Sequence, residues 1–155
     1  MGGFAEYAVV DDRQVAPLPE GMSAVDAAVL MCAGVTIYAA LKRSLRLARD
    51  ITSEKAPGAN VVDARLEEAA EVVARIGQQD GKQEKGDMGL DAVIALPESQ
   101  PAFDYGMALL RNHGRCLVVS FPEKGFHVAA RDLVFRDISV VGNLVGSNKT
   151  LREML

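Results

Sequence analysis

The sequence predicts an α/β fold in which helices flank a partial doubly wound parallel sheet. Three nearly continuous apolar runs, DAVIAL, RCLVVSF and ISVVGNLV, are typical of strands that are covered on both faces. Segments with helical spacing alternate with these runs, and Gly and Pro residues bound them. This alternation favours βαβ units, whose strands are parallel.

The first part of the chain is expected to hold one strand and two helices. Residues 4–10, FAEYAVV, are apolar and β-prone, which predicts a strand. Ser23 precedes an apolar run, and Asp26 follows three residues later, an acidic variant of the capping box that predicts a helix start. Residues 33–36, AGVT, are expected to form a turn, and residues 37–49 look helical again.

Beyond a polar stretch at residues 50–58, strands and helices are expected to alternate. ANVVDA, residues 59–64, predicts a short strand, and the apolar spacing over residues 66–79 predicts an amphipathic helix. The remaining predicted elements are a strand at 90–96, a helix at 101–113, a strand at 114–121, a helix at 129–137, a strand at 138–145 and a helix at 150–155.

Composition excludes several classes of function. The chain has 155 residues, a net charge of −4, 5% aromatic residues and no Trp, which argues against nucleic-acid binding. No apolar run is expected to reach the roughly 20 residues that span a bilayer, so no membrane association is predicted. Two cysteines are too few for a disulfide framework, which favours a cytoplasmic protein.

Sequence motifs alone do not define a catalytic centre. No G-x-G-x-x-G follows a strand, and the Gly-Lys of GQQDGKQ lacks the spacing of a phosphate loop. In a doubly wound sheet, ligands bind where strands end, which draws attention to residues 97–99, 120–122 and 146–148. These segments could equally be ordinary solvated turns. His113 and His127 have no metal-ligand partners at a suitable spacing.

Two long segments carry a family resemblance. GGFAEYAVVD at residues 2–11 and PLPEGMSAVDAAVLMCAGVTIYAALKRS at residues 17–44 resemble the zinc-dependent alcohol dehydrogenases of the medium-chain superfamily, particularly the yeast and fungal type. The resemblance resumes at residue 58 and includes the last three predicted strands. It implies that residues 1–22 are a remnant of the catalytic, GroES-like domain. Residues 23–155 would then be an incomplete Rossmann-type domain that binds NAD(P).

The resemblance also implies a set of site residues. Cys32 matches the third ligand of the catalytic zinc, and Thr36 matches a catalytic threonine that lies against the nicotinamide ring. The remaining implied coenzyme contacts are Val119, Asn143 and Val145 at the carboxamide and Ile94 and Ala95 near the adenosine side. The implied cofactors are zinc and NAD, with NADP as the alternative, and the implied substrate is a small alcohol or aldehyde. Residues 126–130 match the edge strand that pairs two subunits, which implies a homo-oligomer.

The sequence also departs from the family pattern, and these departures are as informative as the resemblance. The other two zinc ligands and the structural zinc lobe belong to a domain that precedes GGFAEY in the family, and the glycine-loop unit is missing near residues 45–58. One thiolate cannot form a three-ligand zinc site, so Cys32 is not expected to bind zinc tightly. We therefore expect this chain alone to be inactive. The alternatives are a non-catalytic module that pairs with itself or a full-length relative, and a residual oxidoreductase activity.

Overall fold

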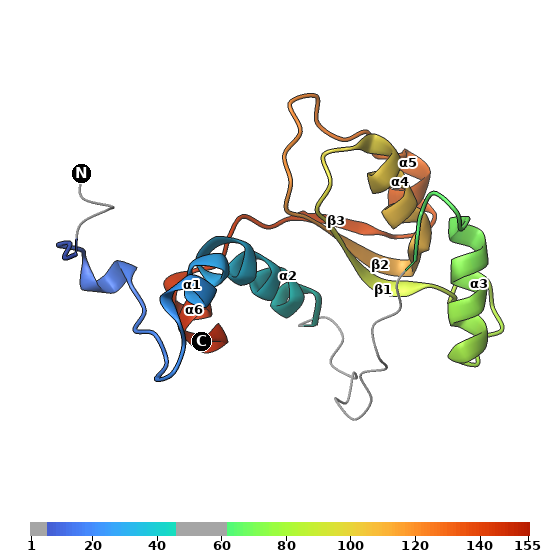
Figure 1. Ribbon diagram of the computed structural model, residues 1–155. Coiled ribbons are helices and arrows are strands. Elements are labelled where there is room, and N and C mark those ends of the chain that lie inside the picture. Colours follow the sequence, from blue (N-terminus) through green and yellow to red (C-terminus); the bar gives the residue numbers. More distant parts are fainter. Residues whose placement is uncertain (1–5, 46–61) are drawn as a thin grey trace. The chain divides into compact units, whose positions relative to one another are not determined.

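A computed structural model describes residues 6–45 and 62–155, and their packing divides into two units (Figure 1). Ala40–Asn143 form one unit, which we call the sheet unit. Met1–Ala39 and Leu144–Leu155 form the other, which we call the terminal unit. These units follow packing, so the predicted domain boundary after residue 22 stays a prediction.

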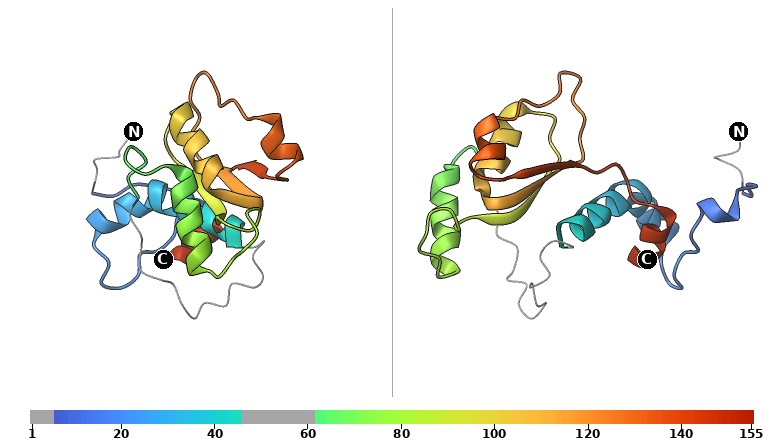
Figure 2. Two further views of the ribbon diagram at one scale, coloured as in Figure 1. Left: turned by 90° about the vertical axis from the view of Figure 1, so that its right-hand side faces the viewer. Right: turned by 180° about the vertical axis from the view of Figure 1, so that it is seen from behind.

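The sheet unit is built on three parallel strands in the order β1-β2-β3 (Figure 2). The strands are β1 (Leu90–Ala95), β2 (Leu110–Val118) and β3 (Ser139–Gly142). The register aligns Ala95 with Val118 and Val118 with Gly142, so the three strands end side by side. The predicted α/β class and all three apolar strands are confirmed.

Strand β2 begins earlier than the sequence suggested. Helix α4 (Gln100–Leu109) was expected to continue to His113, but β2 starts at Leu110. The register is broken between Leu90 and Ala92 of β1, and the regular ladder resumes at Arg115. Backbone hydrogen bonds from Asn112 to the Gly86 carbonyl and from His113 to the Arg136 carbonyl hold the irregular part of β2. These long-range bonds override the helical pattern of RNH.

The core of the sheet unit lies between α4 and the sheet. Its buried members are Ala95, Phe103, Met107, Leu110, Cys116 and Ile138. Phe126 packs against this core, and its ring stacks on that of Phe103 with the centroids 4.5 Å apart. Cys116 and Leu117 are both fully buried although successive strand residues point to opposite faces. Both faces of β2 are therefore covered, as its apolar run predicts.

Helix α3 (Ala69–Gln79) confirms the predicted amphipathic helix and lies beside α4 in Figures 1 and 2. The Tyr105 hydroxyl of α4 donates a hydrogen bond of 3.0 Å to the carbonyl of Glu67, just before α3. Gly77 of α3 is buried, and a Cβ there would stand 2.5 Å from Cγ of Met88. Glycine therefore permits the segment before β1 to pack closely on α3.

In the terminal unit, α1 (Ala24–Val29) begins at the predicted cap. The Ser23 hydroxyl accepts a hydrogen bond from the Asp26 amide at 3.1 Å and donates one to the Asp26 carboxylate at 2.7 Å. The prediction of a turn at residues 33–36, AGVT, is wrong. Leu30–Gly34 form a π-helical turn that joins α1 directly to α2 (Val35–Leu45). The small residues permit the wider turn without breaking the helix.

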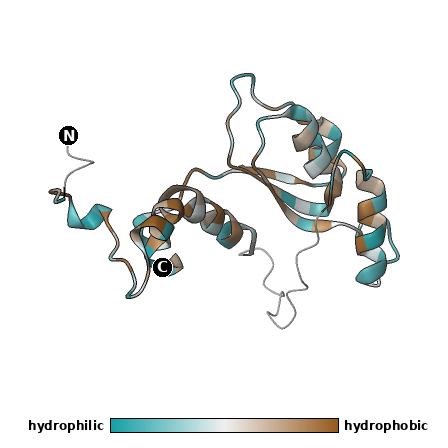
Figure 3. Ribbon diagram, viewed as in Figure 1, coloured by the Kyte–Doolittle hydropathy of each residue, from teal (hydrophilic) through white to brown (hydrophobic). Residues whose placement is uncertain are grey.

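The continuous helix Ala24–Ser44 has 21 residues, and an 18-residue window in it has a mean hydropathy of 1.9. Figure 3 shows the brown, hydrophobic positions along it. By length and composition it could cross a membrane, so the prediction that no apolar run approaches that length is wrong. Core helices of globular proteins meet the same criterion, and length and composition alone do not assign this helix to a bilayer.

Two predicted strands are not found among the described residues. Residues 6–10 of the first are not in a strand, and Tyr7 and Val9 are exposed. Their β-forming side chains have no neighbouring strand on which to pack. Residues 62–64 at the end of the second are also not in a strand, while its first residues, 59–61, lie outside the described part of the chain.

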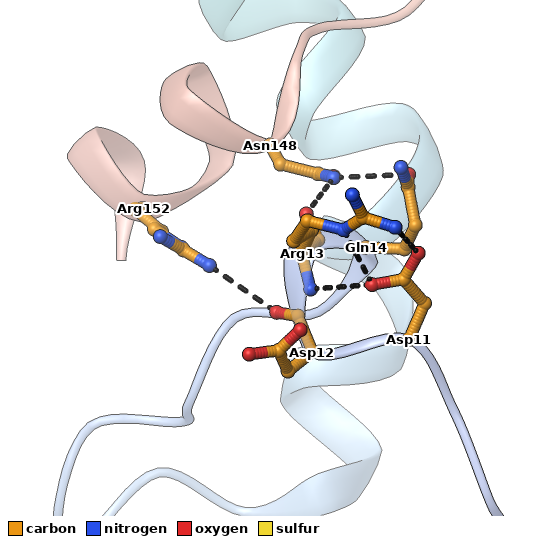
Figure 4. A network of polar contacts seen from close by, with 6 residues as sticks. All are labelled: Asp11, Asp12, Arg13, Gln14, Asn148 and Arg152. Carbon is orange, nitrogen blue, oxygen red and sulfur yellow. Dashed lines mark hydrogen bonds and ion pairs between the residues drawn. The ribbon is translucent and has the colours of Figure 1, made fainter.

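A polar network joins the two ends of the chain within the terminal unit (Figure 4). It connects the short 3-10 helix Asp12–Gln14 to α6 (Asn148–Met154). The Asn148 amide donates hydrogen bonds to the Arg13 carbonyl at 2.7 Å and to Oε1 of Gln14 at 3.1 Å. Arg152 donates to the Val15 carbonyl at 3.1 Å.

Candidate coenzyme site

Three predicted coenzyme residues meet at the carboxyl end of the sheet. The Val119 amide donates a hydrogen bond of 3.2 Å to the Ala95 carbonyl, and the Asn143 amide donates one of 2.9 Å to the Val118 carbonyl. Asn143 is buried, with 7% of its surface exposed. Ile94 lies one residue before Ala95 on β1. The parallel register therefore brings Ala95, Val119 and Asn143 together at the edge where doubly wound sheets bind ligands.

Arg43 also reaches this edge, and sequence reasoning missed it. Its Nη1 donates a hydrogen bond of 2.6 Å to the Gly142 carbonyl and one of 3.4 Å to Oδ1 of Asn143. Arg43 lies in the last turn of α2 and is 99 residues distant from Gly142 in sequence, so no local pattern links the two. The structure thus gives the buried amide of Asn143 a cationic neighbour.

Ser120 closes the turn after β2. Its hydroxyl donates a hydrogen bond of 3.1 Å to the Pro97 carbonyl and lies 3.5 Å from the Ala95 carbonyl. The segments that follow β1 and β2, residues 97–99 and 120–122, are therefore tied to each other. They are connected loops at the carboxyl ends of β1 and β2.

The terminal unit holds the other predicted site residues. The Thr36 hydroxyl donates a hydrogen bond of 2.7 Å to the carbonyl of Cys32, one helical turn earlier. Val145 has a φ of 46°, which is unusual for a β-branched residue. A Cβ on the next residue, Gly146, would stand 2.5 Å from Cγ2 of Val35. Glycine at 146 thus allows the Val145 turn to approach the helix that carries Thr36.

Among the described residues, Cys32 does not have the neighbours that a catalytic zinc needs. It is exposed in the π-helical turn. Within residues 6–45 and 62–155, no group of three His, Cys, Asp or Glu side chains could hold a metal ion. Catalytic zinc takes three protein ligands and keeps one open position. The described residues therefore do not fit a catalytic zinc site.

The other cysteine, Cys116, lies in the core. Cys116 is fully buried in β2, and burial raises the pKa of its thiol to about 11. A neutral, buried thiol is a poor nucleophile and a poor metal ligand. Cys116 therefore acts as a small core residue, as its apolar strand predicts.

Comparison with known families agrees with the fold. A sequence profile described as zinc-binding dehydrogenase matches residues 19–155. The chain belongs to the zinc-binding dehydrogenase family. For this family, NAD(P) and zinc are the family cofactors, and the medium-chain dehydrogenase relationship suggested by residues 17–44 is confirmed.

The relatives of this chain are longer than the chain itself. An alcohol dehydrogenase of Geobacillus stearothermophilus is 29% identical over 181 residues, which cover 99% of this chain and 53% of that protein. A probable cinnamyl alcohol dehydrogenase 2 of Picea abies is 28% identical, with 100% of this chain and 50% of that protein covered. The chain spans about half the length of the curated relatives it matches.

A solved structure supports the same fold assignment. The alcohol dehydrogenase of Aeropyrum pernix matches 99% of this chain and 54% of that chain, with 25% sequence identity and a TM-score of 0.68. The partial Rossmann-like fold of this chain is therefore confirmed. The individual roles implied for Cys32, Thr36, Ile94, Ala95, Val119, Asn143 and Val145 stay predictions.

Proposed function

We propose that the residues at the carboxyl end of the sheet form part of the coenzyme site of an alcohol dehydrogenase. The observation that carries the proposal is the meeting of Ala95, Val119 and Asn143 at the ends of three adjacent parallel strands. Bound NAD(P) would supply the nicotinamide ring that accepts a hydride from a small alcohol. Backbone groups at Val119, Asn143 and Val145 would bind its carboxamide, and Ile94 and Ala95 would pack nearer the adenosine.

Arg43 would act as a positioning residue at this edge. Its hydrogen bonds to the Gly142 carbonyl and to the Asn143 side chain hold the end of β3 in place. Thr36 would face the nicotinamide ring from its helix. The resemblance of residues 32–43 to the yeast and fungal type favours NAD over NADP as the coenzyme.

On their own, these 155 residues are proposed to be catalytically inactive and cytoplasmic. Two features support inactivity: the described residues offer no three-ligand zinc site, and the sequence has no glycine-rich phosphate loop. The match to the Geobacillus enzyme extends over 181 residues, more than this chain contains. That enzyme therefore has residues inside the matched span with no counterpart here, which supports a missing internal unit.

Coenzyme binding and turnover can be tested separately. We expect NADH to shift the amide NMR signals of Ala95, Val119 and Asn143, with no NADH formed from NAD and cinnamyl alcohol in the presence of zinc. Arg43→Ala should weaken NADH binding, whereas Arg65→Ala, which removes an exposed arginine paired with Asp63, should not. NADH shifts confined to other residues would contradict the site. Sustained turnover would contradict inactivity.

A second proposal concerns self-association through residues 126–130. Phe126 and Val128 pack against the core, while the Gln100 side chain binds both the amide of His127 at 2.8 Å and its carbonyl at 2.9 Å. In extended backbone, the polar groups of Phe126 and Val128 then point away from Gln100. This arrangement suits pairing with the same segment of a second copy.

Sedimentation measurements can test this pairing. Val128→Pro removes a backbone donor from the segment and should convert a dimer to a monomer. His127→Ala changes an exposed side chain while keeping every backbone donor, so the dimer should persist. A monomer in the unmodified chain would contradict the proposal.

A further inference from the structure

The sheet unit has an open groove that is remote from the carboxyl ends of its strands. It has a volume of about 770 Å³, within the range of small-molecule sites. Its apolar lining consists of Ala70, Val73, Ala74, Met88, Ala108 and Leu110. Leu110 is the first residue of β2, so this groove lies at the amino end of the sheet. The candidate coenzyme residues lie at the carboxyl end.

Hydrogen bonds fix the walls of the groove. Tyr105 joins α4 to the start of α3, and Met88 packs on Gly77 near the end of α3. The Asn112 amide donates a hydrogen bond of 2.9 Å to the Gly86 carbonyl, which joins the loop before β1 to β2. The groove is therefore framed on several sides by residues that hold one another in position.

The charged part of the lining is entirely basic. Lys85, Arg111, Arg131 and Arg136 line the groove, and no Asp or Glu does, although the chain carries a net charge of −4. Two of these cations already have partners. Arg136 donates to the Met107 and Leu110 carbonyls and pairs with Asp132, and Arg111 pairs with Asp91.

The other two cations are available to a ligand. Among the residues that the structure describes, the side chains of Lys85 and Arg131 have no hydrogen-bond or ion-pair partner. Both are exposed at the groove, one from the loop after α3 and one from α5 (Ala130–Val134). Two such cations beside an apolar wall are complementary to a molecule with an anionic head and an apolar body.

We propose that this groove binds an amphipathic carboxylate, specifically an unbranched fatty acid of medium chain length. The alkyl chain lies along the α3 and α4 side chains, and the carboxylate pairs with Lys85 and Arg131. The lining contains no aromatic residue on which a nucleobase could stack and no carboxylate to receive a cationic ligand. This proposal is independent of the coenzyme site, which lies at the other end of the strands.

The first experiment titrates the 155-residue chain with sodium decanoate, followed by amide NMR. We expect shifts at residues 70–74, 85–88 and 131–136. Two matched probes separate the contributions: 1-decanol keeps the chain without the charge, and sodium acetate keeps the charge without the chain. Each should bind at least about tenfold more weakly than decanoate, since a charged hydrogen bond and the apolar contact both contribute. Equal binding of decanol, or shifts elsewhere, would overturn the proposal.

Variants then test the named residues. Lys85→Gln combined with Arg131→Gln should raise the Kd for decanoate about tenfold and leave that for decanol unchanged. Lys124→Gln, which removes one exposed lysine outside the groove, is the control for loss of positive charge elsewhere on the surface and should leave the Kd for decanoate unchanged. Ala74→Phe fills the groove from the exposed side of α3 and should weaken both decanoate and decanol. An unchanged decanoate Kd in the double variant would exclude the assigned carboxylate partners.

Discussion

The two units of the chain differ in how they are stabilised. The sheet unit has a continuous buried core, in which Phe103 and Leu110 are each 2% exposed and Leu117 is fully buried. The terminal unit exposes many of its large apolar side chains, among them Tyr7, Val9 and Val25. Its two segments are joined by polar contacts, such as those from Asn148 and Arg152, and by the close approach of Gly146 to Val35. A unit with an apolar core is expected to be more stable than one joined by exposed polar contacts.

The largest expected effect comes from the core of the sheet unit. Phe103→Ala should lower the free energy of unfolding by about 3–5 kcal/mol, because it leaves a cavity beside Phe126 and Met107. The measurement is denaturant unfolding, with Val9→Ala as the exposed control. That control should change stability by no more than about 0.5 kcal/mol. If both variants lost a similar amount of free energy of unfolding, the sheet unit would not depend on its buried core more than the terminal unit depends on its exposed apolar side chains.

A smaller effect is expected at the helix contact of the terminal unit. Gly146→Ala places a methyl group 2.5 Å from Cγ2 of Val35 and 3.1 Å from its carbonyl oxygen. We expect a loss of about 1–3 kcal/mol through overpacking. Circular dichroism follows the loss of helix, and chemical labelling of the exposed Cys32 thiol follows the terminal unit separately. Gly125→Ala is a weaker control because it has no neighbours within 4 Å, although its φ of +67° adds some strain.

The smallest effect concerns alkaline pH in the sheet unit. Burial raises the pKa of the Cys116 thiol to about 11 from 9.0, so the folded chain holds this proton more tightly than the unfolded chain. Its contribution to stability is present below pH 9.0 and is lost as the pH rises towards 11. Unfolding measured across this range should show a steeper loss in the unmodified chain than in Cys116→Ala. Identical pH profiles would mean that this thiol does not contribute.

Much of the fold could be predicted because its signals are local. Continuous apolar runs gave β1, β2 and β3, and the cap at Ser23 gave the start of α1. The errors arose where distant residues decide the structure. The bonds from Asn112 and His113 to distant carbonyls replace the last turn of a helix with strand, and a π-turn replaces the expected break at AGVT.

The candidate site shows the same limit. A family resemblance marked Ala95, Val119 and Asn143, and the parallel register explains why they meet. Arg43 could not be found in this way, because its role depends on a contact with Gly142 across most of the chain. The cations Lys85 and Arg131 also belong to separate segments, and only the folded chain brings them to one groove.

The joining of the two chain ends in the terminal unit has a consequence for synthesis. Strands β1, β2 and β3 are neighbours in both sequence and space, so the sheet can grow strand by strand as the polypeptide leaves the ribosome. The contacts of Asn148 and Arg152 with residues 12–15 cannot form until those two side chains have been translated, more than 130 residues later. Residues 12–15 thus wait for their native partners while the sheet unit is being made, and a chaperone would encounter the apolar helix Ala24–Ser44 during that interval.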